Sequence, residues 1–146
     1  MLLVAVCCGI GTARTDRVAT ALPDWRPYIK AGEKVALALT NIGYRTVDRD
    51  VQHVLDNATG VFYDDFKSRA AAFTQVVLDA KSTSTSTITE ARLDSHDAGQ
   101  ARVFVALTAT TINEGQPSPP PRDWRLLITV QKAGEAYKAS NVEFLR

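Results

Sequence analysis

Thiols are nearly absent from this sequence of 146 residues. Its only two cysteines, Cys7 and Cys8, are adjacent, and none follows them. From position 9 onward the chain therefore excludes a disulfide framework, a cysteine-ligated zinc site and a cysteine nucleophile. Because neighbouring cysteines are poorly placed to bridge each other, we interpret both as small hydrophobic side chains of an apolar segment.

An excess of charge of one sign is also missing. The 17 lysines and arginines nearly balance the 16 acidic residues, which leaves a formal net charge of +1. Such a chain has no overall field to steer nucleic acid, and its aromatic residues are not interleaved with basic ones. It contains no glycine-rich nucleotide-binding motif, and its two histidines, far apart in sequence, do not make a metal site. We therefore expect no nucleic-acid partner, no cofactor and no metal.

A long hydrophobic run is lacking as well. The apolar segment 1–13 would rise about 20 Å as a helix, less than the roughly 30 Å of a bilayer core. No basic residue precedes it, as one would in a secretory signal. Three interpretations stay open: part of a transmembrane anchor, which we favour, a signal-type segment, or a buried soluble element. Residues 14–31, with Pro23 and Pro27, are predicted to be a linker to one domain at 32–146.

Helical periodicity begins at Gly32. Apolar residues recur at spacings of three and four up to Ile42, and Gly43 is placed to end this first helix. Thr46 is suited to cap a second helix, with Asp48 and Asp50 near its positive end. The apolar stripe of that helix comprises Val47, Val51, Val54, Leu55 and Ala58.

The stretch "TGVFYDDF" predicts the start of a third, longer helix. Thr59 and Gly60 supply the turn, and one apolar face is formed by Phe62, Phe66, Ala70, Phe73 and Val77. Asp64 and Asp65 fall in the first turns, where carboxylates complement the helix dipole. Adjacent helix positions point about 100° apart, so these two acids are not expected to form a catalytic pair.

The second half of the chain has strand patterns. A β-branched run predicts a strand from about 82 to 93, and "ARVFVALTATTI" alternates as the next strand. The proline-rich "NEGQPSPPPRD" predicts an exposed loop.

In the third strand Trp124, Leu126, Ile128 and Val130 share a face. In the last strand Tyr137 and Ala139 differ in parity from Val142 and Phe144, which predicts a bulge near Ser140 or Asn141.

Three helices followed by four mainly antiparallel strands predict an α+β domain, with the long helix packed across a curved sheet. Four segments, "LTNIGYRTVDRD", "TGVFYDDF", "DWRLLITV" and "SNVEFL", occur in this order within residues 33–146. Together they resemble the Mce-associated membrane proteins of mycobacteria and related actinomycetes. The resemblance implies a single-pass membrane protein whose extracytoplasmic domain has the cone-shaped NTF2-like (cystatin-like) fold.

The same resemblance implies a function without catalysis. Such a protein would be an accessory or stabilising subunit of an Mce-type system that imports sterols or fatty acids across the cell envelope. Its expected partners are Mce transporter subunits and the associated permease, with a hydrophobic lipid as a further ligand. No catalytic, cofactor-binding or metal-binding residue follows from it. Thr59, Gly60, Phe62, Trp124 and Arg125 match recurring family positions, and we assign each a packing or turn role.

Cone folds also include ketosteroid isomerases and polyketide cyclases, so an enzyme or a small-molecule binder with an apolar pocket is the alternative. His53, on a helix, and His96, in a hairpin turn, are interpreted as surface residues. Glu90, Asp94 and Glu143 are expected to face solvent or pair with basic residues, although an inward-facing Glu143 would have a strongly perturbed pKa. A homodimer joined through an exposed sheet face is a third alternative.

Overall fold

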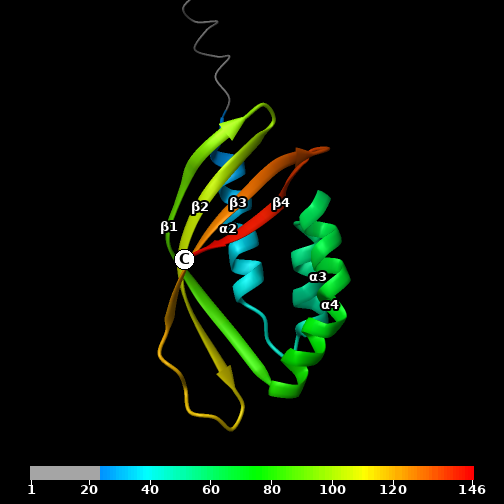
Figure 1. The fold of residues 1–146 in the computed structure, drawn as a ribbon, viewed down its shortest axis with the longest axis vertical. Coiled ribbons are helices and arrows are strands. Elements are labelled where there is room, and N and C mark those ends of the chain that lie inside the picture. Colours follow the sequence, from blue (N-terminus) through cyan, green and yellow to red (C-terminus); the bar gives the residue numbers. More distant parts are fainter. Residues whose placement is uncertain (1–23) are drawn as a thin grey trace, which may run out of the picture.

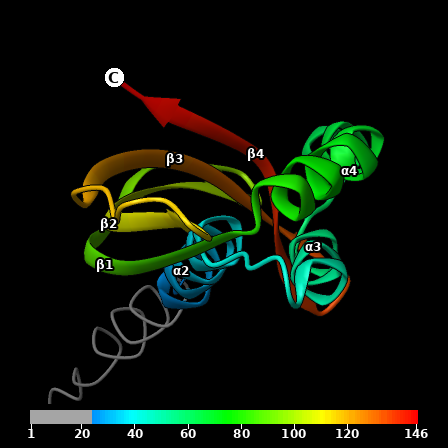
Figure 2. The ribbon, with the colours of Figure 1, turned by 90° about the horizontal axis from the view of Figure 1, so that it is seen from below.

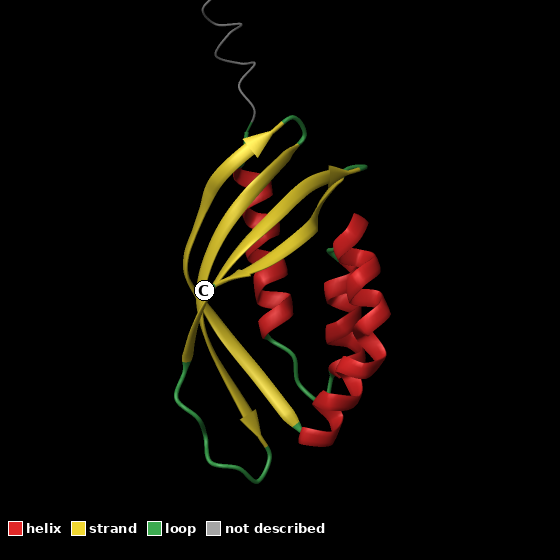
Figure 3. Cartoon of the chain, viewed as in Figure 1, coloured by secondary structure: helices red, strands yellow, loops and turns green. Residues whose placement is uncertain are grey.

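The computed structural model describes residues 24–146, which form three helices and four strands (Figure 1; Figure 3). The predicted apolar segment 1–13 and residues 14–23 of the predicted linker lie outside the described residues. The strands form one antiparallel sheet in the order β1-β2-β3-β4, so the α+β prediction is confirmed. The elements are α2 (Arg26–Thr40), α3 (Val47–Asp56), α4 (Gly60–Ala80), β1 (Ser82–Asp97), β2 (Gln100–Asn113), β3 (Arg122–Ala133) and β4 (Ala136–Leu145).

Helix α2 begins earlier than the periodicity predicts. It starts at Arg26, so the prediction of a linker up to residue 31 is wrong at its C-terminal end. The prediction took Pro27 as a sign of a linker. Proline is, however, well suited to the first turn of a helix, where it loses no hydrogen bond and its φ is already helical. The helix ends at Thr40 with Asn41 as its C-cap, before Gly43, the predicted stop.

The helix that packs across the sheet is α2, not the long helix α4 (Figure 2). It contacts all four strands, and Ala31, Val35 and Ala36 enter the main core with residues of β2, β3 and β4. Helix α4 packs mainly on α3 and β4. The prediction of the long helix on the sheet is therefore wrong. Both helices have apolar faces, and periodicity alone does not say what each face covers.

Helices α3 and α4 enclose a second, smaller core. The predicted apolar face of α4 is confirmed here, since Phe66, Ala70, Phe73 and Val77 pack against Val47 and Val51 of α3. Phe62, one turn earlier, reaches the main core instead. The turn before α4 requires glycine, because Gly60 has φ of 58°, in the left-handed region.

The inner face of the sheet follows the predicted alternation. In β2 every second residue from Ala101 to Ala109 is buried, and in β3 Leu126, Ile128 and Val130 are fully buried. Trp124 has the same parity as these three residues but stays 36% exposed, where its ring meets that of Phe144 edge-on at 5.8 Å.

Bulges bend the edge strands. In β4, Asn141 pairs with Thr129 and Ala139 with Val130, so Ser140 is the extra residue and the predicted bulge is confirmed. The bulge returns Val142 and Phe144 to the same face as Ala139. In β1 the register shifts twice, between Ile88 and Glu90 and between Leu93 and Ser95.

Connections between helices cover part of both sheet edges. Beside β1, Tyr44 N–H donates to the Ser82 carbonyl at 2.8 Å and Ser84 N–H to the Ile42 carbonyl at 2.9 Å. Beside β4, Thr59 N–H donates to the Ala139 carbonyl at 2.8 Å, and Ala139 N–H to the Asn57 carbonyl at 2.9 Å. These bonds fix the helical layer against the sheet at both sides.

Candidate functional site

The family-matching positions do not converge on one site. Thr59 and Gly60 form the α3–α4 turn, and Phe62 packs against the main core, in line with their assigned roles. Trp124 lies on β3, and the exposed Arg125 donates from Nη2 to the Arg146 carbonyl at 2.8 Å. These residues therefore have separate structural positions rather than a common chemistry.

The acidic residues of the strands lie on the surface. Arg92 pairs with Glu90 at 3.1 Å and with Asp94 at 3.8 Å, as the prediction of surface ion pairs requires. Glu143 is exposed and pairs in register with Leu127, on the face opposite Ile128. On α4, Asp65 pairs with Arg69 at 3.3 Å. None of these acids faces the core.

The two histidines have different surroundings. His96 belongs to the end of β1 rather than to the turn, and its ring stacks on Trp25 at a centroid distance of 4.5 Å. His53 is exposed on α3, as predicted, but it also lines a groove between α2 and α3. In residues 24–146 no group of three His, Cys, Asp or Glu side chains could hold a metal ion.

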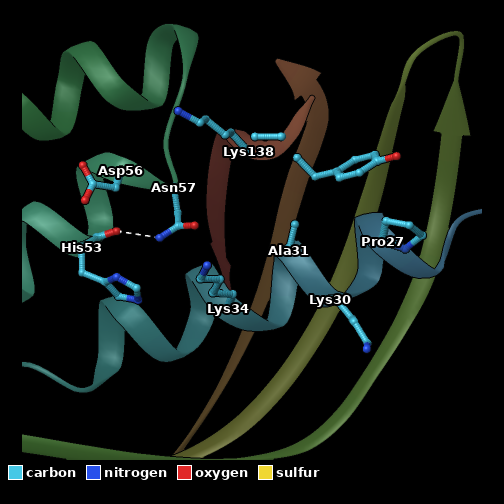
Figure 4. A pocket seen from close by; sticks show the side chains of 10 residues that line it. Pro27, Lys30, Ala31, Lys34, His53, Asp56, Asn57 and Lys138 are labelled. Atoms are coloured by element: carbon cyan, nitrogen blue, oxygen red, sulfur yellow. Dashed lines mark hydrogen bonds between the residues drawn. The ribbon is translucent and has the colours of Figure 1, made fainter. Parts of the chain in front are cut away.

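This α2–α3 groove consists of two adjoining hollows, and Figure 4 shows the first of them. The first, of about 510 Å³, is lined by α2, α3 and the β3–β4 hairpin. The second, of about 240 Å³, continues along α2 toward its C-terminal end, and the two meet at Lys34 and His53. Buried Ala31 and Ala38 and the half-exposed Leu37 give the groove an apolar floor.

Charged side chains of both signs line the groove. Lys30 and Lys34 of α2 and Lys138 of β4 line it, and none forms an ion pair with a described residue. Two aspartates also line it, so their negative charges offset those of the lysines, and each accepts hydrogen bonds from its own helix or the adjoining loop. Asp56 accepts from Gln52 at 2.8 Å, and Asp50 accepts from Gly43 N–H at 3.0 Å and from the hydroxyl of Thr46 at 2.6 Å.

A second polar cluster joins the α2–α3 loop to the end of β2. The Tyr44 hydroxyl donates to Glu114 Oε2 at 2.6 Å, and Arg45 Nε donates to the same hydroxyl at 2.9 Å. The bond from Tyr44, assisted by the charge of Lys81, holds the pKa of Glu114 below its usual value. The bond with Tyr44 also raises the pKa of Arg45. This cluster holds the α2–α3 loop against the end of β2, and its three side chains are already bonded to one another.

The interior formed by the described residues is filled by apolar side chains. Among residues 24–146 no polar or charged residue is buried, and the centre is filled by side chains such as Leu107, Leu126 and Ile128. None of the helices described here is long and apolar enough to cross a bilayer. The groove is thus the feature of the described part that is best suited to recognition.

Comparison with models of protein families shows to which family the chain belongs. The family described as "Uncharacterized protein Rv1363c/MT1408-like" matches residues 13–146. The chain belongs to this family. Rv1363c of Mycobacterium tuberculosis (strain ATCC 25618 / H37Rv) is 38% identical over 107 residues, which are 73% of this chain and 41% of that protein. The chain spans about two fifths of the length of that relative.

Several solved structures have a similar fold at low sequence identity. An IcmL-like type IV secretion system protein of Legionella pneumophila is similar with a TM-score of 0.68 at 11% identity, covering 84% of this chain and 93% of that one. The periplasmic domain of DotI gives 0.68 at 11% identity, covering 86% and 98%. CagV of Helicobacter pylori, a VirB8 homolog, gives 0.64 at 9% identity, covering 81% and 97%. At such identities the likeness concerns the fold alone.

Sequence reasoning missed the groove. Its basic residues come from two places about 100 positions apart, Lys30 and Lys34 on one helix and Lys138 on the last strand. The one local signal was the pair of lysines four residues apart on α2, which is also typical of any solvated helix face. Only the packing of the β3–β4 hairpin beside α2 and α3 brings them together.

Proposed function

We propose that this chain is a non-enzymatic accessory domain on the extracytoplasmic side of the cell envelope, where it supports the assembly of a multi-protein transport complex. The observation that carries the proposal is the fold, three helices on a four-stranded antiparallel sheet, which is similar to the periplasmic domain of DotI and to proteins described as type IV secretion components. We infer from this likeness that the domain is an NTF2-like cone. A domain of this kind acts through its surface, by holding neighbouring subunits in place.

The specific complex we propose is an Mce-type lipid importer, with the N-terminal segment as the membrane attachment. The motivation is the sequence resemblance to Mce-associated membrane proteins. Its four segments become the α2–α3 connection, the start of α4, strand β3 and strand β4. The third and fourth pair directly, from Arg125 with Leu145 to Thr129 with Asn141, and Thr59 of the second bonds to Ala139, the residue before the fourth. The segments thus maintain one scaffold, and the partners expected on its surface are Mce subunits and the permease.

The filled interior supports an adaptor over a cone-fold enzyme. An isomerase of the ketosteroid type needs an acid or base held in an apolar pocket. In the part of the chain that the structure describes, no charged or polar residue is buried, and Glu143, the acid that sequence reasoning singled out, is exposed. Recognition at the surface remains the function that these residues serve best.

Affinity isolation tests the proposal. The tagged protein, expressed from its own locus, is extracted from native membranes in mild detergent, and co-purifying proteins are quantified by mass spectrometry. We expect Mce and permease subunits in near-stoichiometric amounts. A Val54→Asp variant, which places a charge at a fully buried position of α3, serves as the control that capture needs the folded domain.

Two results would contradict the proposal. A wild-type protein that is recovered alone would refute the accessory role. Equal capture by the Val54→Asp variant would mean that the folded domain does not select these partners. A molar mass in solution twice that of the chain, together with recovery alone, would favour the homodimer instead.

A further inference from the structure

We propose that the open end of strand β4 pairs with the same strand of a second copy of this chain, so that two sheets join into one across a two-fold axis. We call residues 141–145 the β4 end. The inference goes beyond the proposed function, since it concerns how copies of the domain associate. Its basis is the direction of backbone groups, an exposed aromatic pair and the charges beside them.

The β4 end has backbone groups that point away from the sheet. At Ala139 both the N–H and the C=O bond to the α3–α4 connection, so neither faces β3. Ala139 pairs with Val130 of β3, and Val142 and Phe144 pair with the residues two and four positions before Val130. In an antiparallel ladder the direction of these groups repeats every second residue. The N–H and C=O of Val142 and Phe144 therefore point outward as well.

This stretch of the edge is open within the described residues. The connection around Thr59 closes the edge at Ala139, but no described segment other than β3 forms a backbone hydrogen bond with the β4 end. Figure 2 shows this end extending away from α3 and α4. An edge with unpaired N–H and C=O groups is a template for a further strand. Its occupant is therefore an extended chain.

An exposed aromatic pair lies beside the open edge. Phe144 is 51% exposed, and its ring meets that of Trp124 edge-on. Both residues have the parity of the core residue Leu126, but neither takes part in the main core. Aromatic residues that lie opposite each other on paired strands stabilise the pairing. A strand that adds here with its own aromatic residue would cover both rings.

The sequence of the β4 end favours pairing with itself in one register. With Phe144 on the two-fold axis, each Phe144 N–H donates to the Phe144 carbonyl of the other copy, as its outward direction requires. The two rings are then opposite each other, and Glu143 lies opposite Leu145 of the second copy. A register centred on Glu143 would instead set two carboxylates about 5 Å apart, which is destabilising.

Charges on the outward face of the sheet complement each other in the same register. Arg125 is paired with Leu145, and its side chain crosses to β4, where Nη2 donates to the Arg146 carbonyl at 2.8 Å. Because Glu143 of the second copy lies opposite Leu145, its carboxylate comes within reach of this guanidinium. Neither Arg125 nor Glu143 forms an ion pair within residues 24–146. The two-fold axis provides this contact twice, as an isologous interface requires.

The expected dimer is weak. Five residues from each copy, with two rings, bury less than the roughly 1,200 Å² of a standard interface. We therefore expect a Kd above about 1 μM, so that the molar mass depends on concentration.

Sedimentation equilibrium of the full chain tests the inference. The chain is kept in a mild detergent at matched density, over concentrations well below and well above the expected Kd. Phe144→Gln changes the β4 end, and Val76→Gln makes a similar apolar-to-amide change on α4, where Val76 is 65% exposed. Glu143→Arg, Arg125→Glu and their combination test the register by exchange of the two charges. Circular dichroism confirms that each variant is folded.

We expect the wild type to dimerise. Phe144→Gln should raise Kd more than about tenfold, because burial of an aromatic side chain is lost in both copies. Val76→Gln should change Kd by less than about twofold. Glu143→Arg and Arg125→Glu should each raise Kd about 2- to 25-fold, and their combination should restore it. Hydrogen exchange at the amides of Val142 and Phe144 should slow as the concentration rises.

Other results overturn the inference. A chain that stays monomeric at every concentration has no such contact. A dimer that Phe144→Gln leaves unchanged joins through another surface, such as the outward face of the sheet or the apolar N-terminal segment. Slow exchange at Val142 and Phe144 that is independent of concentration means that the chain itself closes the edge. A monomer that loses co-purifying subunits only in Phe144→Gln assigns the edge to a partner protein.

Affinity isolation separates this inference from the proposed function. If the wild type dimerises through Phe144 but captures no transporter subunit, the β4 contact stands and the accessory role fails. If it captures these subunits and is monomeric, the accessory role stands and the β4 contact fails.

Discussion

At Gly32 helix α2 lies close to the sheet, and replacement of this glycine by alanine tests how rigidly the two are packed. A Cβ added there would lie 2.9 Å from both Cβ and Cγ1 of Val103. Val103 is fully buried in β2, between β1 and β3, so its backbone is held on both sides. Its β-branched side chain is also stiff about χ1.

Two opposing free energies set the expected effect of Gly32→Ala. Alanine is favoured over glycine inside a helix by about 1 kcal/mol. Overpacking a close-packed core costs about 1–3 kcal/mol, and here the clash involves a Cβ that no rotamer change moves. We therefore expect a net loss of about 1 kcal/mol in the free energy of unfolding. Val103→Ala alone should cost about 2 kcal/mol, and the double variant less than the sum, because the new methyl group fills vacated space.

Urea unfolding followed by circular dichroism measures these values. With a slope of about 1–3 kcal/mol/M, a loss of 1 kcal/mol lowers the midpoint by about 0.3–1 M. Lys30→Ala, at an exposed position of the same helix, should change stability by only about 0.3 kcal/mol. If Gly32→Ala proved about 1 kcal/mol more stable than the wild type, α2 would be free to move away from Val103, and the close-packing argument would be refuted.

Three further predictions concern single contacts. Gly60→Ala should lose about 1–2 kcal/mol of stability in the same assay, because φ of 58° is strained for alanine; an unchanged midpoint would mean that the turn adapts. Asn41→Ala should lose about 1–3 kcal/mol and speed hydrogen exchange at Ser86, whose N–H donates to Asn41 Oδ1 at 3.0 Å; unaltered exchange would contradict this role. Tyr44→Phe should raise the pKa of Glu114, measured by NMR titration, since the hydroxyl that lowers it is removed. Because the pKa of Glu114 is lowered in the folded state, its ionised form stabilises the fold at a pH above the unfolded-state pKa. This stabilisation is lost as the pH falls through the folded-state pKa, so the stabilities of variant and wild type should converge in acid.

Periodicity predicted those elements whose apolar residues all face one neighbour. The face from Phe66 to Val77 and the alternation from Leu126 to Val130 each describe a single buried surface, so spacing alone was sufficient. The bulge at Ser140 was predictable for the same reason, because two apolar sets of opposite parity must share one core.

What periodicity did not predict depends on contacts between distant segments. Nothing local to Gly32 indicates that Val103 will lie 2.9 Å from a Cβ placed there, or that α2 rather than α4 will pack across the sheet. The groove follows from the same arrangement, since Lys34 and Lys138 become neighbours only once α2 is in place. Both features are properties of helix placement, which amphipathic patterns leave undetermined.

The coverage of the two sheet edges has a consequence for how the domain meets its neighbours. An open edge strand is a template onto which any extended chain can add, and crowded assemblies are especially exposed to such mispairing. Here the backbone around Tyr44 occupies the start of β1, and that around Thr59 occupies the middle of β4. Further along β1, register shifts and the charges of Glu90 and Asp94 interrupt a regular ladder. These stretches of the two edges are thereby closed to strand addition, so a neighbouring chain would meet side chains there, which select by shape and charge.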